Sequence, residues 1–376
     1  MYRYFIACGK NSENLLATEL SELGAMSVKP SNGGVWAFHS DMTFHYLINL
    51  YSRLAIRVLL PIADFYLPSN QSLYDQLYQI PWDHYFSAER SLLIQANIRN
   101  SGFNNSHFIE LKTKDAICDY FRLHSQTRPN IDKHHPEIVV NVYIQNNQCQ
   151  VSLDSSGRSL NKRGYRPEGA EASLRETLAA TLIRYIRWDG ATPFYDLMCG
   201  AGTIPIEAAW IASKQAPGLL TPKFTFQNWN DYDSHKFKAI IQEAREKVLP
   251  VLSAPIIAND WDSRNYNLTR TNSRRAGVES FLEFSQEDIF EYKPIHTKGV
   301  MILNPPYGRR VQPGSTMTRH FFQRLNDKLK QDFKGFTVGI LSPEMDELRE
   351  INMTPDRVYK VYNGNILCYF AIFKIY

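Results

Sequence analysis

The pattern of hydrophobic and polar residues changes near residue 161. Before that point, short apolar runs typical of β-strands alternate with segments whose apolar residues recur every three or four positions, as in helices. The segments of strand character are YRYFIACG, VWAFHS, LLIQANIR and IVVNVYIQNNQCQVSLDSS, the last a hairpin turning at Asn146 and Asn147. The segments of helical character are NSENLLATELSELGA, MTFHYLINLYSRLAIRVLL and TKDAICDYFRLH. This part of the chain is therefore predicted to be α+β.

After residue 161, strand and helix patterns alternate at the spacing of a parallel sheet whose strands are joined by helices. The predicted strands are TPFYDLMCG, APIIANDWD, LEFSQEDIF, VMILNPPY and FTVGILSP, and the predicted helices include TIPIEAAWIAS and SRNYNLTRTNSRRAG. In the final segment, Asn363 and Gly364 stand between two apolar runs and predict a closing hairpin. The predicted fold class is α/β, with domains over residues 1–60, 61–161 and 162–376.

The composition fits a chain with sizeable hydrophobic cores, since 44% of its 376 residues are hydrophobic. Five scattered cysteines without a CxxC pair argue against a disulfide framework or a metal site, and they favour a reducing cytoplasm. No apolar run approaches the roughly 20 residues that a membrane helix needs, so we expect no membrane partner. The formal net charge of +4 allows a nucleic-acid partner without requiring one.

The segment DLMCGAGT, residues 196–203, predicts a ligand-binding turn. A strand ends at Asp196, Gly200 and Gly202 let the backbone approach a ligand closely, and a helix with free N–H groups begins at Thr203. The third glycine of the dinucleotide fingerprint is missing, which argues against NAD. Because no histidine lies near Cys199 in sequence, we expect this residue to be a packed thiol rather than a nucleophile.

Two acidic residues follow later strands. Asp260 is placed to accept hydrogen bonds from both hydroxyls of a ribose, and Trp261 beside it can lie against an adenine; alone, Asp260 fits a helix N-cap equally well. Asp288 can accept from an adenine amino group, although alone it reads as a solvated loop acid. Since ligands of open α/β sheets bind at the carboxyl ends of strands, the set predicts a charged nucleoside, with S-adenosylmethionine as the candidate.

The stretch NPPY, residues 304–307, ends another strand. Its amide and carbonyl oxygens suit a planar amino group whose lone pair is delocalised into a ring. The side-chain oxygen of Asn304 and the carbonyl of Pro305 can accept the hydrogens of the amino group, Pro306 stiffens the chain, and Tyr307 can stack on the base. The predicted chemistry is methylation of such an amino group by in-line positioning, without a strong general base.

These motifs resemble those of class I amino-methyltransferases. The resemblance extends along the whole chain to the bacterial large-subunit ribosomal RNA guanine-N2 methyltransferases of the RlmL type. It is carried by NGGVWAF, YSRLAIRVLLPI, KTKDAICDYF, RPNIDKHHPEIVVNVYI, SLDSSGRSLNKRGYR, SLRETLAATLI, APGLL and FQNW. It implies a ferredoxin-like segment over residues 1–60, a THUMP RNA-binding domain over 61–161 and a Rossmann-like catalytic domain over 162–376.

The resemblance also implies roles for the residues at the site. For the cofactor it implies the set Thr177, Asp196, Met198, Gly200, Gly202, Thr203, Asp260, Trp261, Asp288, Ile289 and Asn304. Of these, Asp196, Gly200, Gly202 and Thr203 belong to the methionine end, Asp260 to the ribose and Asp288 to the adenine, and Thr177 lies near the cofactor. For the target guanine it implies Asn304, Pro305, Pro306 and Tyr307.

Basic residues next to the predicted site suit contacts with RNA phosphates. They are Arg158, Lys162, Arg163 and Arg166 where the halves of the chain join, and Arg309, Arg310 and Arg319 after the catalytic segment. The expected partner is 23S rRNA or a precursor of the large ribosomal subunit, with the target base unstacked into the site. Part of the role of LNKRGYR, residues 160–166, is expected to be packing of the domains.

Other substrates fit the same motifs. Some relatives continue into a second methyltransferase that makes 7-methylguanine; this chain ends after one catalytic domain, so only N2 methylation is expected. NPPY-type segments also serve methylation of tRNA guanine, of adenine N6 and of protein glutamine. A non-catalytic rRNA-binding assembly factor is a further alternative, against which Asp196 and Asn304 argue.

Overall fold

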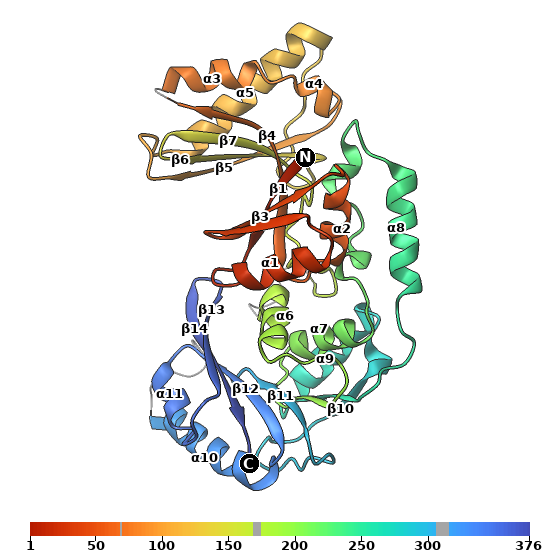
Figure 1. Ribbon diagram of the computed structural model, residues 1–376, viewed down its shortest axis with the longest axis vertical. Helices are drawn as coiled ribbons and strands as arrows, with labels where there is room; N and C mark the ends of the chain where they lie inside the picture. The colour runs from red at the N-terminus through yellow and green to blue at the C-terminus, as the bar shows by residue number, and fades with distance from the viewer. Residues whose placement is uncertain (68–69, 168–173, 306–315) are drawn as a thin grey trace.

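The computed structural model describes residues 1–67, 70–167, 174–305 and 316–376. Within these residues the chain forms two seven-stranded β-sheets, one from each half of the sequence, which follow one another along the long axis of the molecule (Figure 1). The predicted α/β fold class is confirmed. No helix in the described part of the chain is long and apolar enough to cross a membrane.

The N-terminal sheet has the strand order β2-β3-β1-β4-β7-β6-β5. Its strands are β1 (Tyr2–Cys8), β2 (Ser27–Ser31), β3 (Gly34–His39), β4 (Ala55–Tyr66), β5 (Leu92–Arg99), β6 (Ile138–Gln145) and β7 (Gln148–Asp154). The helices of this half are α1 (Glu13–Glu22), α2 (Phe44–Tyr51), α3 (Asn70–Tyr78), α4 (Trp82–Tyr85) and α5 (Ser106–Ser125). The hairpin predicted at Asn146 and Asn147 is confirmed, and their φ angles of 49° and 62° are those of a tight hairpin turn.

The helix predicted over MTFHYLINLYSRLAIRVLL is wrong in its second half. Helix α2 ends at Tyr51, where the Glu19 carboxylate accepts hydrogen bonds from Ser52 Oγ at 2.6 Å and from the Arg53 N–H at 2.9 Å. The following residues form β4, which pairs with β1 on one side and β7 on the other. Tertiary pairing therefore overrides the local helical pattern. The boundary expected after residue 60 falls inside this strand.

The C-terminal sheet has the order β10-β9-β8-β11-β12-β14-β13, with β10 to β12 parallel and β14 antiparallel to β12. Its strands are β8 (Phe194–Asp196), β9 (Ile256–Asn259), β10 (Leu282–Ser285), β11 (Gly299–Leu303), β12 (Phe336–Ser342), β13 (Arg357–Asn363) and β14 (Ile366–Lys374). The helices are α6 (Glu176–Tyr185), α7 (Thr203–Ala212), α8 (Ser234–Glu246), α9 (Ser263–Arg275), α10 (Thr316–Asp332) and α11 (Met345–Arg349), with short 3-10 turns η1 (Pro217–Leu220), η2 (Thr225–Asn228) and η3 (Glu279–Phe281).

The two halves pack against each other through an excursion of the C-terminal half. Helix α8 leaves the second sheet and lies beside the N-terminal half (Figure 1), where it contacts α2, and the turn η2 contacts β6. There the ring of Tyr46 stacks on Phe226 with centroids 4.5 Å apart, and it meets Phe237 edge-on at 5.4 Å. The halves therefore share an aromatic core, which sets the N-terminal half relative to the second sheet.

Candidate active site

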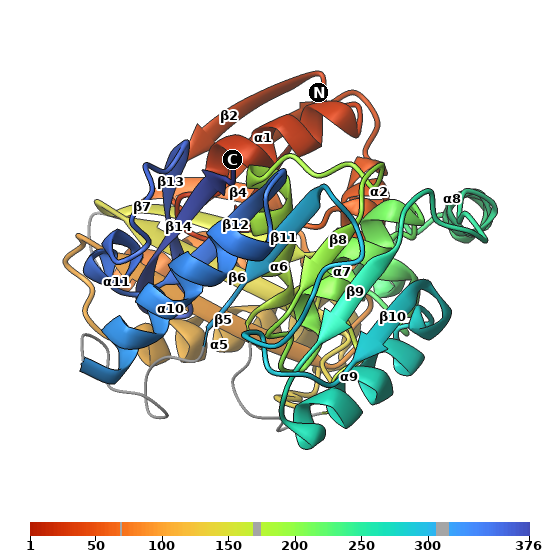
Figure 2. The ribbon, with the colours of Figure 1, turned by 90° about the horizontal axis from the view of Figure 1, so that it is seen from below.

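Four neighbouring strands bring the predicted site residues to one edge of the second sheet. In the order β10-β9-β8-β11, the carboxyl ends lead to Asp288, Asp260, Asp196 and Asn304 respectively (Figure 2). The parallel register pairs Asp196 with Ala258 and Met301 with Tyr195, so these strands end at similar heights. Sequence distances of up to about a hundred residues are thus closed by strand pairing.

The glycine loop between β8 and α7 has two positions with different requirements. Gly200 and Gly202 have φ angles of 57° and 79°, which L side chains rarely adopt. A Cβ added at Gly202 would stand 2.8 Å from Cγ2 of Thr269, whereas a Cβ at Gly200 would meet no atom within 4 Å. Gly202 therefore allows close packing inside the protein, and Gly200 borders open space.

Helix α9 holds this loop from outside the glycine motif. Thr269 Oγ1 donates to the carbonyl of Gly200 at 2.9 Å, and Asn272 Nδ2 donates to that of Ala201 at 2.9 Å. Neither residue was predicted from the sequence. The only signal available was the presence of polar residues on a helix that follows a strand end, and it does not identify the loop that they bind.

Asp260 is a buried carboxylate that organises the loops after β8 and β9. Its Oδ2 accepts from the Gly200 N–H at 2.8 Å, and its Oδ1 accepts from the Asp262 N–H at 3.0 Å and from Asn265 Nδ2 at 3.2 Å. The N-cap of α9 is Asp262, which accepts from the Arg264 N–H at 2.8 Å. The helix-cap alternative for Asp260 is therefore wrong. Its neighbour Trp261 is 69% exposed.

Asn259, just before Asp260, joins three strand ends and was also missed. Its Nδ2 donates to the carbonyls of Leu197 at 3.1 Å and Glu287 at 2.9 Å. Its Oδ1 accepts from Ser285 Oγ at 2.9 Å and from the Glu287 N–H at 3.0 Å. All four polar bonds of this buried amide serve to hold the edge that carries the site.

Asp196 is almost completely buried, and its Oδ1 accepts from the Met198 N–H at 3.2 Å. Burial raises the pKa of this carboxyl well above its usual value, and the charge of Asp260 acts in the same direction. A cationic ligand group beside Asp196 would favour its ionised form. Cys199 is buried with its Sγ 3.3 Å from Thr269 Oγ1, so the predicted packed thiol is confirmed.

The adenine and substrate residues differ in exposure. Asp288 is exposed, and its Oδ1 accepts from the Phe290 N–H at 2.9 Å, while Ile289 is buried. Asn304 follows β11, and its Oδ1 is buried without a hydrogen-bond partner among the described residues. Pro305 is buried next to it. The remaining catalytic and RNA-binding candidates of this segment lie outside the described residues: Pro306, Tyr307, Arg309 and Arg310.

Thr177 and Thr203 lie on two packed helices. Both are buried, Thr203 as the first residue of α7 and Thr177 in α6, which packs against α7. Met198, inside the glycine loop, is half-buried. The helix that carries Thr177 therefore packs on the helix that begins at the glycine loop.

The basic residues at the junction of the halves fall into two groups. Lys162 is exposed and Arg158 half-buried, and neither has an acidic partner in the described part of the chain. Arg163 is buried: its Nη2 donates to the Arg53 carbonyl at 2.6 Å, its Nη1 to the Leu160 carbonyl at 2.8 Å, and its Nε to Glu207 at 3.3 Å. The expected RNA contact of Arg163 therefore does not fit this structure, because its guanidinium packs the junction.

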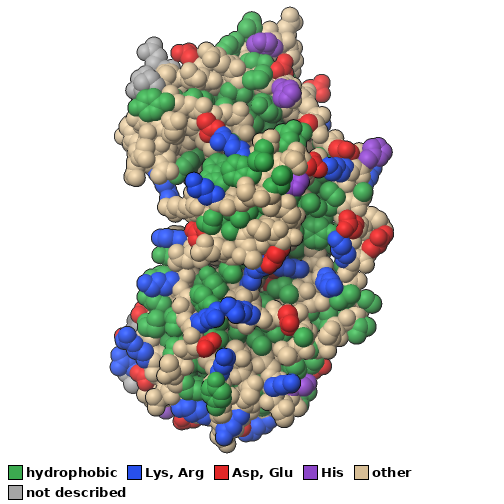
Figure 3. Space-filling view, viewed as in Figure 1, with side chains coloured by type: hydrophobic (Ala, Val, Ile, Leu, Met, Phe, Trp, Pro, Cys, Tyr) green, Lys and Arg blue, Asp and Glu red, His purple; other side chains and the backbone are tan. Residues whose placement is uncertain are grey.

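Arg166 and Arg319 complete the basic set. Arg166 Nε donates to Glu176 at 3.0 Å, so its charge is largely compensated at the start of α6. Arg319 is exposed on α10. On the face in Figure 3, most Lys and Arg side chains lie over the middle and lower parts of the molecule.

The described residues contain no group of three or more His, Cys, Asp or Glu side chains suited to a metal.

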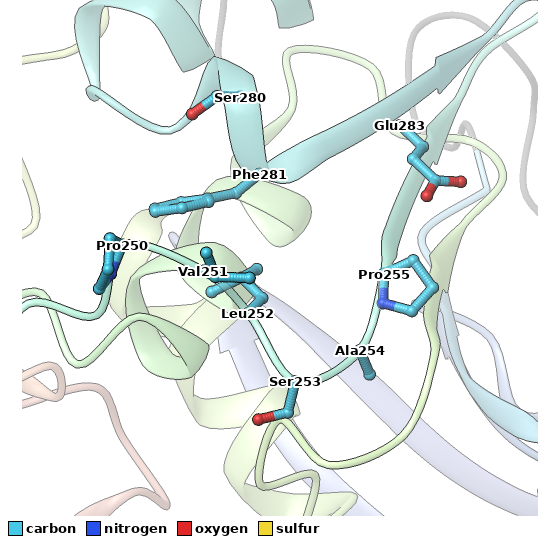
Figure 4. Close-up of a pocket in the computed structure, with 9 residues that line it drawn as sticks. All are labelled: Pro250, Val251, Leu252, Ser253, Ala254, Pro255, Ser280, Phe281 and Glu283. Atoms are coloured by element: carbon cyan, nitrogen blue, oxygen red, sulfur yellow. The ribbon is translucent and has the colours of Figure 1, made fainter.

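A hollow of about 390 Å³ lies elsewhere on the second sheet. Figure 4 shows its lining by residues 250–255 before β9 and by Ser280, Phe281 and Glu283 at the start of β10. These residues precede or begin their strands, whereas the site residues follow them. The hollow therefore lies at the opposite edge and is not part of the site.

Three family models match consecutive parts of the chain. Residues 3–59 match the RlmL ferredoxin-like domain, residues 69–154 the THUMP domain, and residues 163–372 the RMKL-like methyltransferase domain. The order of domain types is the one that the motifs predicted.

Relatives match along the full chain. A protein of Synechocystis sp., provisionally named an RNA methyltransferase, is 37% identical over 99% of this chain and 97% of its own length. The ribosomal RNA large subunit methyltransferase K/L of Syntrophotalea carbinolica is 34% identical over 99% of this chain. The chain spans only 53% of that protein, about half its length, and the same share of K/L relatives from Shewanella.

Solved structures match the whole fold. SMU.472, described provisionally as a methyltransferase and crystallised with SAH, superposes with a TM-score of 0.90 at 26% identity, over 100% of this chain and 98% of that one. A possible methylase from Clostridium difficile 630 superposes with a TM-score of 0.89 at 27% identity, with the same coverage of both chains.

Proposed function

This chain belongs to the family of RMKL-like methyltransferases, and from that membership we propose that it methylates the exocyclic N2 of a guanine in 23S rRNA. It is a methyltransferase whose cofactor is S-adenosylmethionine, as the family and the SAH-bound structural relative indicate. The THUMP domain and the relatives named for ribosomal RNA point to RNA as the substrate. Because the K/L relatives are about twice as long, the assignment to N2 of a 23S guanine is our proposal.

The residues at the strand ends suit this cofactor. Gly200 borders open space next to the beginning of α7, where free N–H groups favour a carboxylate. The buried Asp196 gains from a neighbouring ammonium or sulfonium, and Asp260 offers its carboxylate to the ribose hydroxyls. Asp288 keeps Oδ2 outside the hydrogen bond to Phe290, so this oxygen can accept from the adenine amino group.

One observation carries the proposed chemistry: Asn304 Oδ1 is buried and unpartnered within the described residues, at the same sheet edge as Asp196 and Asp260. A buried acceptor without a donor is unfavourable by about 1–3 kcal/mol, so this oxygen suits a donor that arrives with the substrate. The two hydrogens of an amino group are such donors, with the carbonyl of Pro305 as the second acceptor.

When bound, S-adenosylmethionine supplies an electrophilic methyl group. Asn304 and Pro305 hold the amino nitrogen of the substrate so that its lone pair faces that methyl group, and positioning of this kind lowers the barrier without a strong base. The methylated nitrogen would be acidic and would release its proton to water, with S-adenosylhomocysteine as the other product. The guanine must leave its stack to reach these groups.

Arg158 and Lys162 are the described residues that we assign to the RNA phosphates, with Arg319 beyond the catalytic segment. Arg158 and Lys162 lie between the parts of the chain that match the THUMP domain and the methyltransferase domain. A duplex or hairpin held by the THUMP domain would pass these two residues on its way to the site.

The test compares rRNA from a deletion strain complemented with wild type, Asn304→Ala or Asn228→Ala. Asn228 is the matched control, because its Oδ1 is also buried and unpartnered among the described residues but lies in η2. Mass mapping is expected to show one N2-methylguanine of 23S rRNA lost in the deletion strain and in Asn304→Ala, and restored by wild type and Asn228→Ala.

Other outcomes would contradict the proposal in different ways. Loss of a methyl group from tRNA guanine or from an adenine would keep the chemistry and replace the substrate. Retention of every rRNA methylation in the deletion strain would exclude rRNA. A deletion phenotype rescued fully by Asn304→Ala would favour the non-catalytic assembly factor.

A further inference from the structure

We propose that Lys328 is a positioning residue for the cofactor: from α10 it fixes the turn that carries Asp288 and thereby sets recognition of the adenine amino group. The inference rests on the proposed function only in assigning Asp288 to the adenine, and it adds a residue that no motif identifies.

Lys328 is a buried cation with two partners. Its side chain is 6% exposed, and its Nζ donates to the carbonyl of Phe290 at 2.8 Å and to Asp332 Oδ2 at 2.7 Å. A lysine at this depth is unfavourable unless its charge and hydrogens are compensated, and lysine is rarely buried in proteins. The bond to Phe290 is charge-assisted and therefore among the stronger hydrogen bonds of the fold.

The Phe290 carbonyl belongs to a tight turn built around Asp288. The Asp288 carbonyl accepts from the N–H groups of Glu291 and Tyr292, both at 2.9 Å, and its side-chain Oδ1 accepts from the Phe290 N–H at 2.9 Å. One carboxylate oxygen is thus held by the turn, and the direction of the other depends on where Phe290 lies. Fixing Phe290 therefore fixes the exposed oxygen of Asp288.

Three side chains on one face of helix α10 contact Phe290. Phe321 meets the Phe290 ring edge-on with centroids 5.6 Å apart, and Arg324 Cζ lies 3.9 Å from the centroid of the same ring. Lys328 donates a hydrogen bond to the Phe290 carbonyl. The spacing i, i+3, i+7 places all three on a single helical stripe. The same helix is the first described element after Pro305 in the chain.

The chain offers a matched control two residues away. Lys330 also donates its ammonium to a backbone carbonyl, that of Asn352 at 2.9 Å, on a segment outside the site. Lys328→Met and Lys330→Met thus delete the same group from the same helix while keeping the length of the side chain. Only the first deletion releases the adenine turn.

The test measures dissociation constants for SAH and for S-inosylhomocysteine, which lacks the adenine amino group, in wild type, Lys328→Met, Lys330→Met and Lys328→Arg. We expect wild type to prefer SAH, because Asp288 accepts from the amino group and repels the inosine oxygen. In Lys328→Met the dissociation constant for SAH should rise about tenfold. The ratio of the dissociation constants for S-inosylhomocysteine and SAH should fall toward one. Lys330→Met should match wild type, and Lys328→Arg should keep most of the preference.

An unchanged preference in a folded Lys328→Met protein would overturn the inference, and so would an equal loss in Lys330→Met. Thermal melting reports folding; if Lys328→Met does not fold, the same comparison with Phe290→Leu and Arg324→Gln decides, because both loosen the grip on the turn. Binding of SAH needs no RNA. A wild-type protein that binds SAH but methylates no rRNA would contradict the proposed function and leave this comparison valid.

Discussion

The backbone N–H of Gly200 donates a hydrogen bond of 2.8 Å to Oδ2 of Asp260. This bond joins the loop after β8 to the end of β9, so the carboxylate assigned to the ribose also holds the glycine loop. The other oxygen, Oδ1, accepts from Asp262 and Asn265. A single buried side chain therefore sets the spacing between the parts of the site that would bind the two ends of the cofactor.

Asp260→Asn should weaken SAH binding by tenfold or more, on the order expected when a charge-assisted acceptor is lost. The asparagine side chain can accept from the Gly200 N–H only if its NH₂ group faces the Asp262 N–H and Asn265 Nδ2. These two donors then have no acceptor. Calorimetric titration with SAH checks the loss. Asp262→Asn is the control, because it alters the cap of α9 and the ion pair with Arg264 but no side-chain bond to the glycine loop. Equal weakening there would contradict the role of Asp260.

Alanine at the two loop glycines should separate folding from binding. Gly202→Ala should lower the melting temperature, because its Cβ would stand 2.8 Å from Thr269 Cγ2. Gly200→Ala meets no protein atom within 4 Å, so its cost should be about 1 kcal/mol of backbone strain, while its methyl group fills the space for the cofactor. Thermal melting with and without SAH tests both. Stabilisation of Gly200→Ala by SAH equal to that of wild type would place the cofactor elsewhere.

Lys162→Ala should weaken RNA binding and reduce its salt dependence. Removing one phosphate contact lowers the slope of log K against log salt by roughly 0.7–0.9. Filter binding of 23S rRNA fragments at several salt concentrations measures this slope. Lys247→Ala should leave the slope unchanged, because Lys247, just after α8, is paired with Glu243. A slope unaffected by Lys162→Ala would remove this residue from the RNA surface.

Arg163→Met should destabilise the fold by about 3–5 kcal/mol at neutral pH, because it leaves the buried Glu207 without its nearest cation. Burial raises the pKa of Glu207, while Arg163 and Arg53 hold it down. Without Arg163 that pKa rises further, so the deficit should shrink as the pH falls and Glu207 takes up a proton. Urea unfolding at pH 7 and pH 5 measures both effects.

The control for Arg163 is Arg184→Met, which breaks the more exposed pair with Glu22 and should cost less than about 1 kcal/mol. If the two variants are equally stable, or if the deficit of Arg163→Met grows at low pH, the junction pair does not support the fold as described.

His45 should make the protein acid-sensitive. Burial lowers the pKa of this imidazole from 6.5 to about 4, and its Nδ1 lies 2.8 Å from the Met42 carbonyl. Between pH 6.5 and about pH 4, His45 is protonated in the unfolded chain but neutral in the folded chain. The contribution of His45 to the free energy of unfolding is therefore fully present above pH 6.5 and is lost as the pH falls from 6.5 to about 4. The loss from this residue at pH 5 is about 2 kcal/mol.

The measurement for His45 is the free energy of unfolding in urea at pH 7 and pH 5, compared with His45→Gln. The glutamine variant should lose about 2 kcal/mol less than wild type between these pH values. Identical pH profiles would mean that His45 binds its proton equally well in the folded and the unfolded protein.

Several site residues could be predicted because they are local to strand ends. Asp196, Gly200 and Gly202 lie within one strand–turn–helix segment, and Asp260 and Asn304 directly follow apolar runs. Period and turn chemistry are short-range properties, and parallel sheets place the carboxyl ends of strands at one edge. The hairpin turn after β13 was likewise predicted to within one residue, with Gly364 and Asn365 between the paired Asn363 and Ile366.

Long-range contacts decided the rest. The sequence of β4 continues a helical pattern, but the strand pairs on both sides in the sheet. The sequence suggests that Arg163 is a surface cation, but its guanidinium is buried and donates to Glu207 and to the carbonyl of Arg53. Strand edges and burial are properties of the packed chain, so no window of sequence contains them.

The sequence by itself determined the types of element, the glycine loop and the polar residues that end each strand, because these depend on neighbours in the chain. Only the tertiary structure decided that Thr269 and Asn272 hold that loop, and that Lys328 reaches the turn of Asp288. Hydrogen-bond partners separated by tens of residues are chosen by how helices pack on a sheet, and the free energy of that packing is shared across the whole core.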